Sequence, residues 1–157
     1  MGQDVFSASG ITSITIGSGL RVINTLEFRD CNSITSFTVS ADNQYFASED
    51  GVMYDKYKNK ILYYPKAKSA TTLTLPSNIT TFGDQVFPFG CTISTFTLTN
   101  GQYTSISNDR STIFDNVDTT RLIRVAPGYS GLYTVPTSIK ILANGAFSNC
   151  CFMTGVL

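Results

Sequence analysis

Apolar and polar residues alternate at five places along the chain, as in strands that bury one face and expose the other. The two apolar positions of these strands are Ile14 and Ile16, Phe37 and Val39, Leu73 and Leu75, Phe96 and Leu98, and Tyr133 and Val135. Their first positions, 14, 37, 73, 96 and 133, are separated by 23, 36, 23 and 37 residues. A strand pattern that returns at a regular spacing is typical of a solenoid, in which each turn buries its apolar face against its neighbours.

The alternating spacing divides the chain into short and long repeats. We predict short repeats over 11–33, 70–92 and 131–152, long repeats over 34–69 and 93–130, and a single solenoid domain over 4–157. Each short-repeat strand is followed by single apolar residues at matching positions, as Leu75 is by Ile79, Phe82, Phe87 and Cys91. These residues are expected to line the interior, so the predicted fold class is a β-rich solenoid.

The additional residues of each long repeat predict a β-hairpin insert. In the first insert, two apolar runs, Val52–Tyr54 and Ile61–Tyr64, flank the polar sequence DKYKNK, and Pro65 ends the second run. In the second insert, Ile113–Asp115 and Leu122–Val125 repeat this pattern. We therefore expect two hairpins attached to the solenoid, one in each long repeat.

The balance of charged residues argues against some classes of binding partner. The chain has 11 basic and 11 acidic residues and a formal net charge of zero, which does not suit a dedicated nucleic-acid or anionic-membrane binder. No apolar run approaches the ~20 residues of a membrane helix, so we expect no membrane insertion by this segment, and its N-terminus lacks the pattern of a signal peptide.

The C-terminal sequence CFMTGVL lacks the polar residues of a terminal cap. We expect either that the protein continues beyond Leu157 or that end-to-end self-association through uncapped repeats covers this edge.

Three of the four cysteines, Cys31, Cys91 and Cys150, fall at the same point of the repeat, and Cys151 follows the last of them. Cys31 and Cys91 lie two or more turns apart, roughly 10 Å at ~4.8 Å per strand, whereas a disulfide needs Cα atoms within about 7 Å. We therefore expect free thiols that point inward and pack as small apolar side chains. They leave the redox compartment open.

The repeat resembles the BspA-like leucine-rich repeats, whose pattern is L-x-x-L-x-L-P-x-x-V-x-x-I-x-x-x-A-F-x-x-C. Gly145–Cys150 (GAFSNC) closely matches its A-F-x-x-C end, Asp84–Cys91 has the same end with one inserted residue, and 25–31 (TLEFRDC) lacks the alanine. The first insert, from Asn43 to Lys56, resembles the family's N-x-x-Y-x-S-x-D-G-V-L-Y-D-K hairpin. The second insert departs from it, with NDR at 108–110 in place of Asp-Gly.

This resemblance covers about residues 5–156. It implies a right-handed solenoid with a concave parallel β-sheet of about five to six strands. The family is associated with the cell surfaces of bacteria and parasitic protists and with adhesion to host proteins. The resemblance therefore implies a protein that is displayed at the cell surface or secreted as part of a longer chain, with a host-surface or extracellular-matrix protein as its partner.

The outward positions of the predicted strands form the first candidate binding surface. They are lined with hydroxyls, from Ser13, Thr15, Ser36, Thr38, Thr72, Thr74, Thr95, Thr97 and Thr134. A continuous sheet of five strands would make this face about 24 Å wide at ~4.8 Å per strand. Threonine is also simply a favourable strand residue that tolerates water, so the same pattern fits a solvated face without a ligand.

The first hairpin is the second candidate, through Tyr54, Lys56, Tyr57, Lys58 and Lys60. Tyrosine offers a large contact area at low entropic cost, and the five lysines within 56–68 would suit a polyanionic glycan such as heparan sulfate. In the alternative interpretation, the aromatic residues pack the hairpin onto the solenoid and the lysines keep an exposed strand edge soluble.

Catalytic chemistry is poorly represented. The chain has no histidine, the commonest general base and metal ligand, and it shows no phosphate-binding or dinucleotide-binding motif. We therefore predict no enzymatic activity and no cofactor. Asp109, Asp115 and Asp118 form a loose acidic cluster without the spacing of a calcium loop. Asn78-Ile79-Thr80 is a glycosylation sequon, which matters only in a protein secreted by a eukaryote.

Two functions fit these observations. The first is a non-enzymatic protein-binding or adhesion module of a cell-surface leucine-rich-repeat protein, with contacts through the concave sheet and the hairpins. The alternative is a structural scaffold segment of a longer repeat protein whose binding is carried elsewhere.

Overall fold

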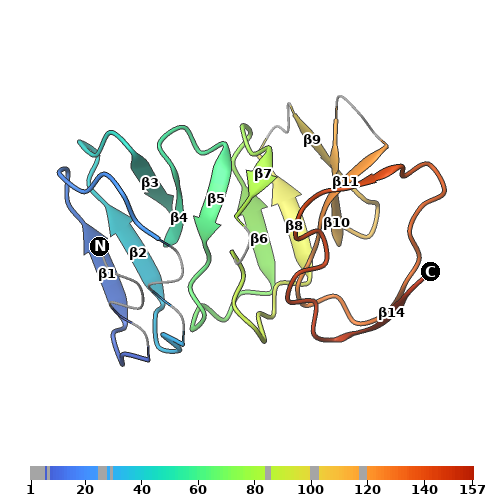
Figure 1. The fold of residues 1–157 in the computed structure, drawn as a ribbon, viewed down its shortest axis with the longest axis horizontal. Helices are drawn as coiled ribbons and strands as arrows, with labels where there is room; N and C mark the ends of the chain where they lie inside the picture. Colours follow the sequence, from blue (N-terminus) through green and yellow to red (C-terminus); the bar gives the residue numbers. More distant parts are fainter. Residues whose placement is uncertain are drawn as a thin grey trace.

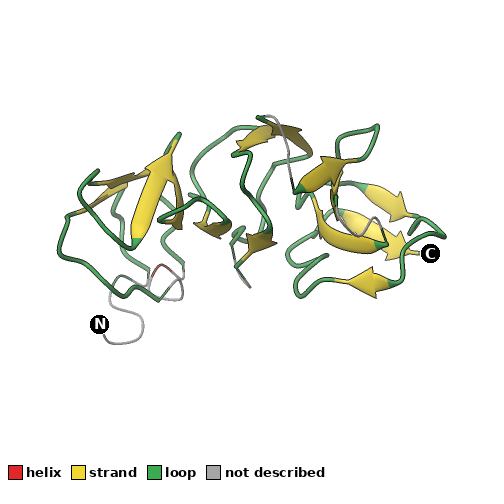
Figure 2. Cartoon of the chain, turned by 90° about the horizontal axis from the view of Figure 1, so that it is seen from above, coloured by secondary structure: helices red, strands yellow, loops and turns green. Residues whose placement is uncertain are grey.

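The computed structural model describes residues 6, 8–24, 28, 30–83, 86–99, 103–116 and 120–157. Residues 4 and 5, with which the predicted domain begins, lie outside the described residues. The repeats follow one another along the long axis, from β1 (Ser13–Ile16) at one end to β14 (Met153–Val156) at the other (Figure 1). Seen from above, the chain keeps this elongated arrangement (Figure 2). The β-rich solenoid predicted from the spacing is thus confirmed.

Within the described ranges, six strands occupy the position at which the apolar–polar alternation recurs. Besides β1 and β14 they are β2 (Ser36–Val39), β6 (Thr72–Leu75), β8 (Thr95–Leu98) and β12 (Gly131–Tyr133). They associate as three parallel pairs, β1–β2, β6–β8 and β12–β14. The register aligns the predicted apolar positions, so that Ile14 lies beside Phe37 and Leu73 beside Phe96. Parallel pairing of these strands follows from the repeat, because each turn brings the chain back in the same direction.

The three pairs do not join into the continuous concave sheet that the sequence predicts. At the open edge of β2, the amide of Phe37 donates to the carbonyl of Gly51 at 2.9 Å, and at β8 the amide of Phe96 donates to the carbonyl of Arg110 at 2.8 Å. Each hairpin insert therefore occupies the edge on which the next strand would pair. Gly51 permits this close approach, because its φ is +74° and a Cβ there would lie 3.1 Å from Cβ of Ser36.

The inserts form a second row of strands. The first contains β3 (Phe46–Glu49), β4 (Val52–Asp55) and β5 (Lys60–Tyr63), and the second contains β9 (Thr104–Ile106), β10 (Thr112–Asp115) and β11 (Arg121–Val125). The predicted hairpins are confirmed as the antiparallel pairs β4–β5 and β10–β11. β3 and β9 add a third antiparallel strand to each insert, which the alternation did not predict.

The following short repeat extends each insert by one parallel strand. β7 (Thr81–Phe82) pairs with β5, and β13 (Ile141–Leu142) pairs with β11. The two resulting four-stranded sheets are not hydrogen-bonded to each other, and β7 ends the first of them. At this break in the second row, β7 lies opposite β11 across a groove.

Apolar residues from successive repeats stack in the interior. Phe28 and Phe87, which hold equivalent positions, are fully buried, and the equivalent Phe147 is half-buried in the C-terminal repeat. The central core cluster contains residues from an insert as well as from a short repeat. Val52, Tyr54 and Ile61 of the first insert pack in it together with Leu75 and Phe87 of the short repeat that follows. The inserts are therefore part of the core.

The four cysteines are free. Cys31 and Cys91 are buried and Cys150 is half-buried, but Cys151 is exposed, so the expectation of inward thiols is wrong for Cys151. The thiol of Cys31 donates to the carbonyl of Phe6 at 2.7 Å, in the preceding turn, and that of Cys150 approaches the carbonyl of Ala126 at 3.7 Å. Burial raises the pKa of the Cys91 thiol to about 11, which keeps it protonated and unreactive at neutral pH.

Buried tyrosines predict a loss of stability at alkaline pH. Burial raises the pKa of Tyr63 to about 12 and also raises the pKa values of Tyr54 and Tyr64. The unfolded chain releases phenolic protons near pH ~10, whereas the folded protein keeps them to higher pH. This contribution to stability is therefore complete below pH ~10 and is lost as the pH rises through ~12.

Urea unfolding followed by circular dichroism at about pH 8, 10 and 11.5 measures this effect. The midpoint is expected to change little between the first two values and to fall at the third. Replacing Tyr63 by phenylalanine should make the fall smaller. A constant midpoint up to pH ~11.5 would contradict the assignment of these raised pKa values.

Candidate binding surfaces

The hydroxyl side chains of the repeated strands lie outward, as predicted. The nine residues, Ser13, Thr15, Ser36, Thr38, Thr72, Thr74, Thr95, Thr97 and Thr134, are exposed or half-buried. On β6–β8 the parallel register places Thr72 beside Thr95 and Thr74 beside Thr97, with 2.8 Å between the hydroxyl oxygens of each pair. The face is divided into separate two-strand areas, because the inserts interrupt the sheet, and Thr134 lies just beyond the end of β12.

The predicted hairpin contacts fall into two groups. Tyr57 projects from the tip of the β4–β5 hairpin with 74% of its surface exposed, in a turn closed by a 3.0 Å bond from the amide of Lys58 to the carbonyl of Asp55. Tyr54 is only 1% exposed, so its assignment as a surface contact is wrong. It packs beside Val52 and Ile61 in the central core cluster, because β4 is covered by the solenoid.

Most lysines of the first insert are already engaged within the molecule. Lys56 donates to the carbonyls of Ala41 and Asn43, and Lys66 donates to Oδ1 of Asn32 at 2.6 Å. Lys58 pairs with Glu49 at 2.5 Å and Lys68 with Asp50 at 3.1 Å. Lys60 is the exception, since its ammonium has no partner among the described residues. The five lysines therefore do not form one free basic patch.

Asp109, the first residue of the acidic cluster in the second insert, has a structural role. The carboxylate of Asp109 accepts hydrogen bonds from the hydroxyl of Ser107 and from the amide and hydroxyl of Ser111, which closes the β9–β10 turn. Partial burial raises the pKa of Asp109, but these hydrogen bonds outweigh it and hold the pKa below its ordinary value. Asp118 lies outside the described residues, and within them no group of three acidic or cysteine side chains could hold a metal ion. Asn78 of the sequon is exposed.

A groove that the sequence did not predict lies between β7 and β11. It has a volume of about 380 Å³ and is lined on its two sides by Lys60, Thr80, Thr81 and Phe82, and by Arg121, Ile123, Leu142, Ala143 and Asn144. Lys60 and Arg121 begin the last strand of their inserts, so aligning the two inserts would have shown a basic residue at the same position in both.

The C-terminal repeat exposes several apolar side chains, and these lie on or beside β12, β13 and β14. They are Leu132, Ile141, Leu142, Phe152, Val156 and Leu157. The end-to-end contact expected at this edge stays a prediction.

In the part of the chain that the structure describes, no helix has the length and apolar character needed to cross a membrane.

The comparisons with known proteins agree with this geometry. The family model of the BspA-type leucine-rich-repeat region matches residues 1–50 and 59–123, with six copies of the repeat. A leucine-rich repeat protein from Eubacterium ventriosum superposes with a TM-score of 0.64 at 20% identity, covering 99% of this chain and 38% of its own. The pneumococcal vaccine antigen PcpA superposes with a TM-score of 0.56 at 16% identity, covering 94% of this chain and 43% of its own.

Among curated proteins, no sequence matches this chain significantly. The chain spans less than half the length of the two solved structures, and at these identities the likeness concerns the fold. The family match extends over well more than half of the sequence and includes both inserts in part. Together with the repeated strands, the stacked phenylalanines and the recurring cysteines, it establishes that this chain belongs to the BspA-type leucine-rich-repeat family.

Proposed function

We propose that this chain is a non-enzymatic protein-binding module of a cell-surface or secreted repeat protein, acting in adhesion to a host-surface or extracellular-matrix protein. Membership of the BspA-type family supports the interaction role. The presence of a vaccine antigen among the similar structures supports display outside the cell.

The observation that carries the proposal is the preformed hydroxyl surface on β6–β8. Thr72, Thr74, Thr95 and Thr97 stand on two strands in exact register, and their side chains are held by hydrogen bonds to one another. A partner that covers such a surface does not have to order mobile side chains, which lowers the entropic cost of association. Each hydroxyl pair has already satisfied part of its hydrogen-bonding capacity, so covering these hydroxyls together with the threonine methyl groups carries a smaller desolvation cost.

Tyr57 is the best anchor on the first hairpin. A large aromatic side chain exposed at a turn is the kind of residue that dominates interface energetics, and its backbone is fixed by the antiparallel strands on both sides. Because β4 and β5 contribute buried residues such as Val52 and Ile61, deletion of the whole insert would disrupt the core. Single substitutions are therefore the appropriate test.

Surface plasmon resonance against a panel of purified extracellular-matrix proteins provides that test. The wild-type chain should bind at least one of them, and Tyr57→Ser or Thr74→Arg should weaken this binding at least ~10-fold. Tyr103→Ser and Thr137→Arg are matched controls at exposed sites elsewhere and should leave the affinity unchanged. Failure of the wild-type chain to bind any protein of the panel, or equal binding by all variants, would favour the scaffold alternative.

A further inference from the structure

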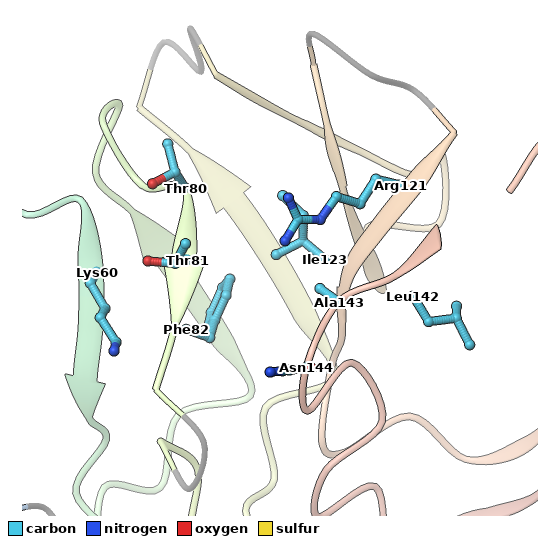
Figure 3. Close-up of a pocket in the computed structure, with 9 residues that line it drawn as sticks. All are labelled: Lys60, Thr80, Thr81, Phe82, Arg121, Ile123, Leu142, Ala143 and Asn144. Atoms are coloured by element: carbon cyan, nitrogen blue, oxygen red, sulfur yellow. The ribbon is translucent and has the colours of Figure 1, made fainter. Parts of the chain in front are cut away.

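The groove between β7 and β11 is lined by two cationic side chains that no described residue neutralises. Lys60 stands on the β5–β7 side and Arg121 on the β11 side, with Asn144 at the end of the groove (Figure 3). Neither cationic group has a hydrogen-bond or ion-pair partner among the described residues, and none of the nine lining residues is acidic. The carboxylate of Asp55 accepts a hydrogen bond from the backbone amide of Lys60 at 2.8 Å, not from its ammonium group.

This placement differs from that of every other lysine in the first insert. The other four lysines bind carbonyl, amide or carboxylate oxygens of the protein itself, so their ammonium groups already have partners within the molecule. Lys60 and Arg121 instead line opposite sides of one hollow of about 380 Å³, each from a different long repeat. Two unpartnered cations beside one concave surface raise the local concentration of anions, and an arginine can hold a carboxylate through two parallel hydrogen bonds.

The remaining lining groups indicate which kind of anion fits. Thr80 and Thr81 offer hydroxyls and Asn144 an amide, all of which can donate and accept, while the ring of Phe82 borders the same space (Figure 3). A sugar that carries a carboxylate presents matching features in one rigid unit: an anion, several hydroxyls and an apolar C–H face. The volume is also within the ~300–1,000 Å³ of small-ligand sites.

An acidic peptide fits the groove less well. Its backbone would need a strand edge for hydrogen bonding, as in recognition by strand addition, and the edge strand available here, β7, has only two residues. We therefore propose that the β7–β11 groove binds carboxylated saccharides, with Lys60 and Arg121 as the carboxylate ligands and Thr80, Thr81 and Asn144 as partners of the sugar hydroxyls. The site lies on a different sheet from the hydroxyl surface of β6–β8, so it does not depend on the protein-binding function proposed above.

Titration of the ¹⁵N-labelled protein with 3′-sialyllactose and with digalacturonate, followed by NMR, tests the proposal. Both are expected to shift the amide resonances of Thr80, Thr81 and Asn144 with dissociation constants in the millimolar range or below, whereas neutral lactose should not. The double variant Lys60→Gln/Arg121→Gln should bind at least ~10-fold more weakly, because it lacks the charged hydrogen bonds.

The double variant Lys66→Gln/Arg110→Gln is the matched control, because it removes the same charge from exposed positions outside the groove. It should bind both acidic sugars as the wild-type chain does. Three results would overturn the proposal: no response to either acidic sugar at ~10 mM, an equal loss of affinity in the control variant, or stronger shifts of the same amides with tetraglutamate than with the sugars.

Discussion

Replacing Phe87 by alanine is expected to lower the free energy of unfolding by about 3–5 kcal/mol. The ring is fully buried at the centre of the solenoid, with ring centroids of Tyr64 at 5.7 Å, Phe82 at 6.0 Å and Phe96 at 6.4 Å. These neighbours come from an insert, the same short repeat and the following strand, so they cannot all move in to fill the cavity. The loss is a large share of the ~5–15 kcal/mol typical of a domain.

Phe89→Ala is the matched control, because Phe89 lies two residues away and is 69% exposed. Its effect should stay within ~0.5 kcal/mol. Urea unfolding monitored by circular dichroism compares the two variants with the wild-type chain. Equal and small effects for both would mean that Phe87 does not form part of the stacked core.

Arg124→Ala is expected to be about as costly, at ~3–5 kcal/mol. The side chain is 1% exposed, and its guanidinium donates from Nη1 to the carbonyl of Gly145 and from Nη2 to the carbonyl of Ser148 at 2.5 Å. It also lies 4.9 Å from the ring centre of Phe87. Truncation would leave a cavity and remove two partners from the turn that carries the A-F-x-x-C sequence of the last short repeat.

We expect the charge of Arg124 to contribute less to stability than the packing of its side chain. Within the described part of the chain no carboxylate pairs with Arg124 and its Nε has no hydrogen-bond partner, and burial lowers the pKa of this guanidinium to about 10. In the first insert the equivalent position, paired across the hairpin in the same way, is held by Tyr63. Arg124→Met, which fills much of the same volume, should therefore recover at least half of the stability lost in Arg124→Ala.

Thermal and urea unfolding of the two Arg124 variants measure this difference. Arg121→Ala is the control, because Arg121 lies on the same strand and is exposed, and its effect should stay within ~0.5 kcal/mol. A methionine variant that is as unstable as the alanine variant would show that the hydrogen bonds to the carbonyls, not the packing, account for the role of Arg124.

Much of this fold could be predicted because its main signal is local and repeated. The spacing of Ile14, Phe37, Leu73 and Phe96 located four of the parallel strands, and the positions of Phe87 and Cys91 located the interior. Strand burial alternates with a period of two, so the same pattern also assigned the outward threonines correctly. The hairpins followed from apolar runs separated by turn residues.

The tertiary structure decided what depends on contacts between repeats. The carbonyls of Gly51 and Arg110 take the amides at the edges of β2 and β8, which turns one expected sheet into separate pairs. Tyr54 is buried because β4 packs against the solenoid core, whereas Tyr57, at the hairpin tip, is exposed. Most lysines of the first insert found partners distant in sequence. Lys60 instead lines one groove with Arg121, which lies 61 positions further along the chain. A periodic sequence determines which residues face inward, whereas the pairing of edges, charges and cavities depends on how the irregular inserts pack against their neighbours.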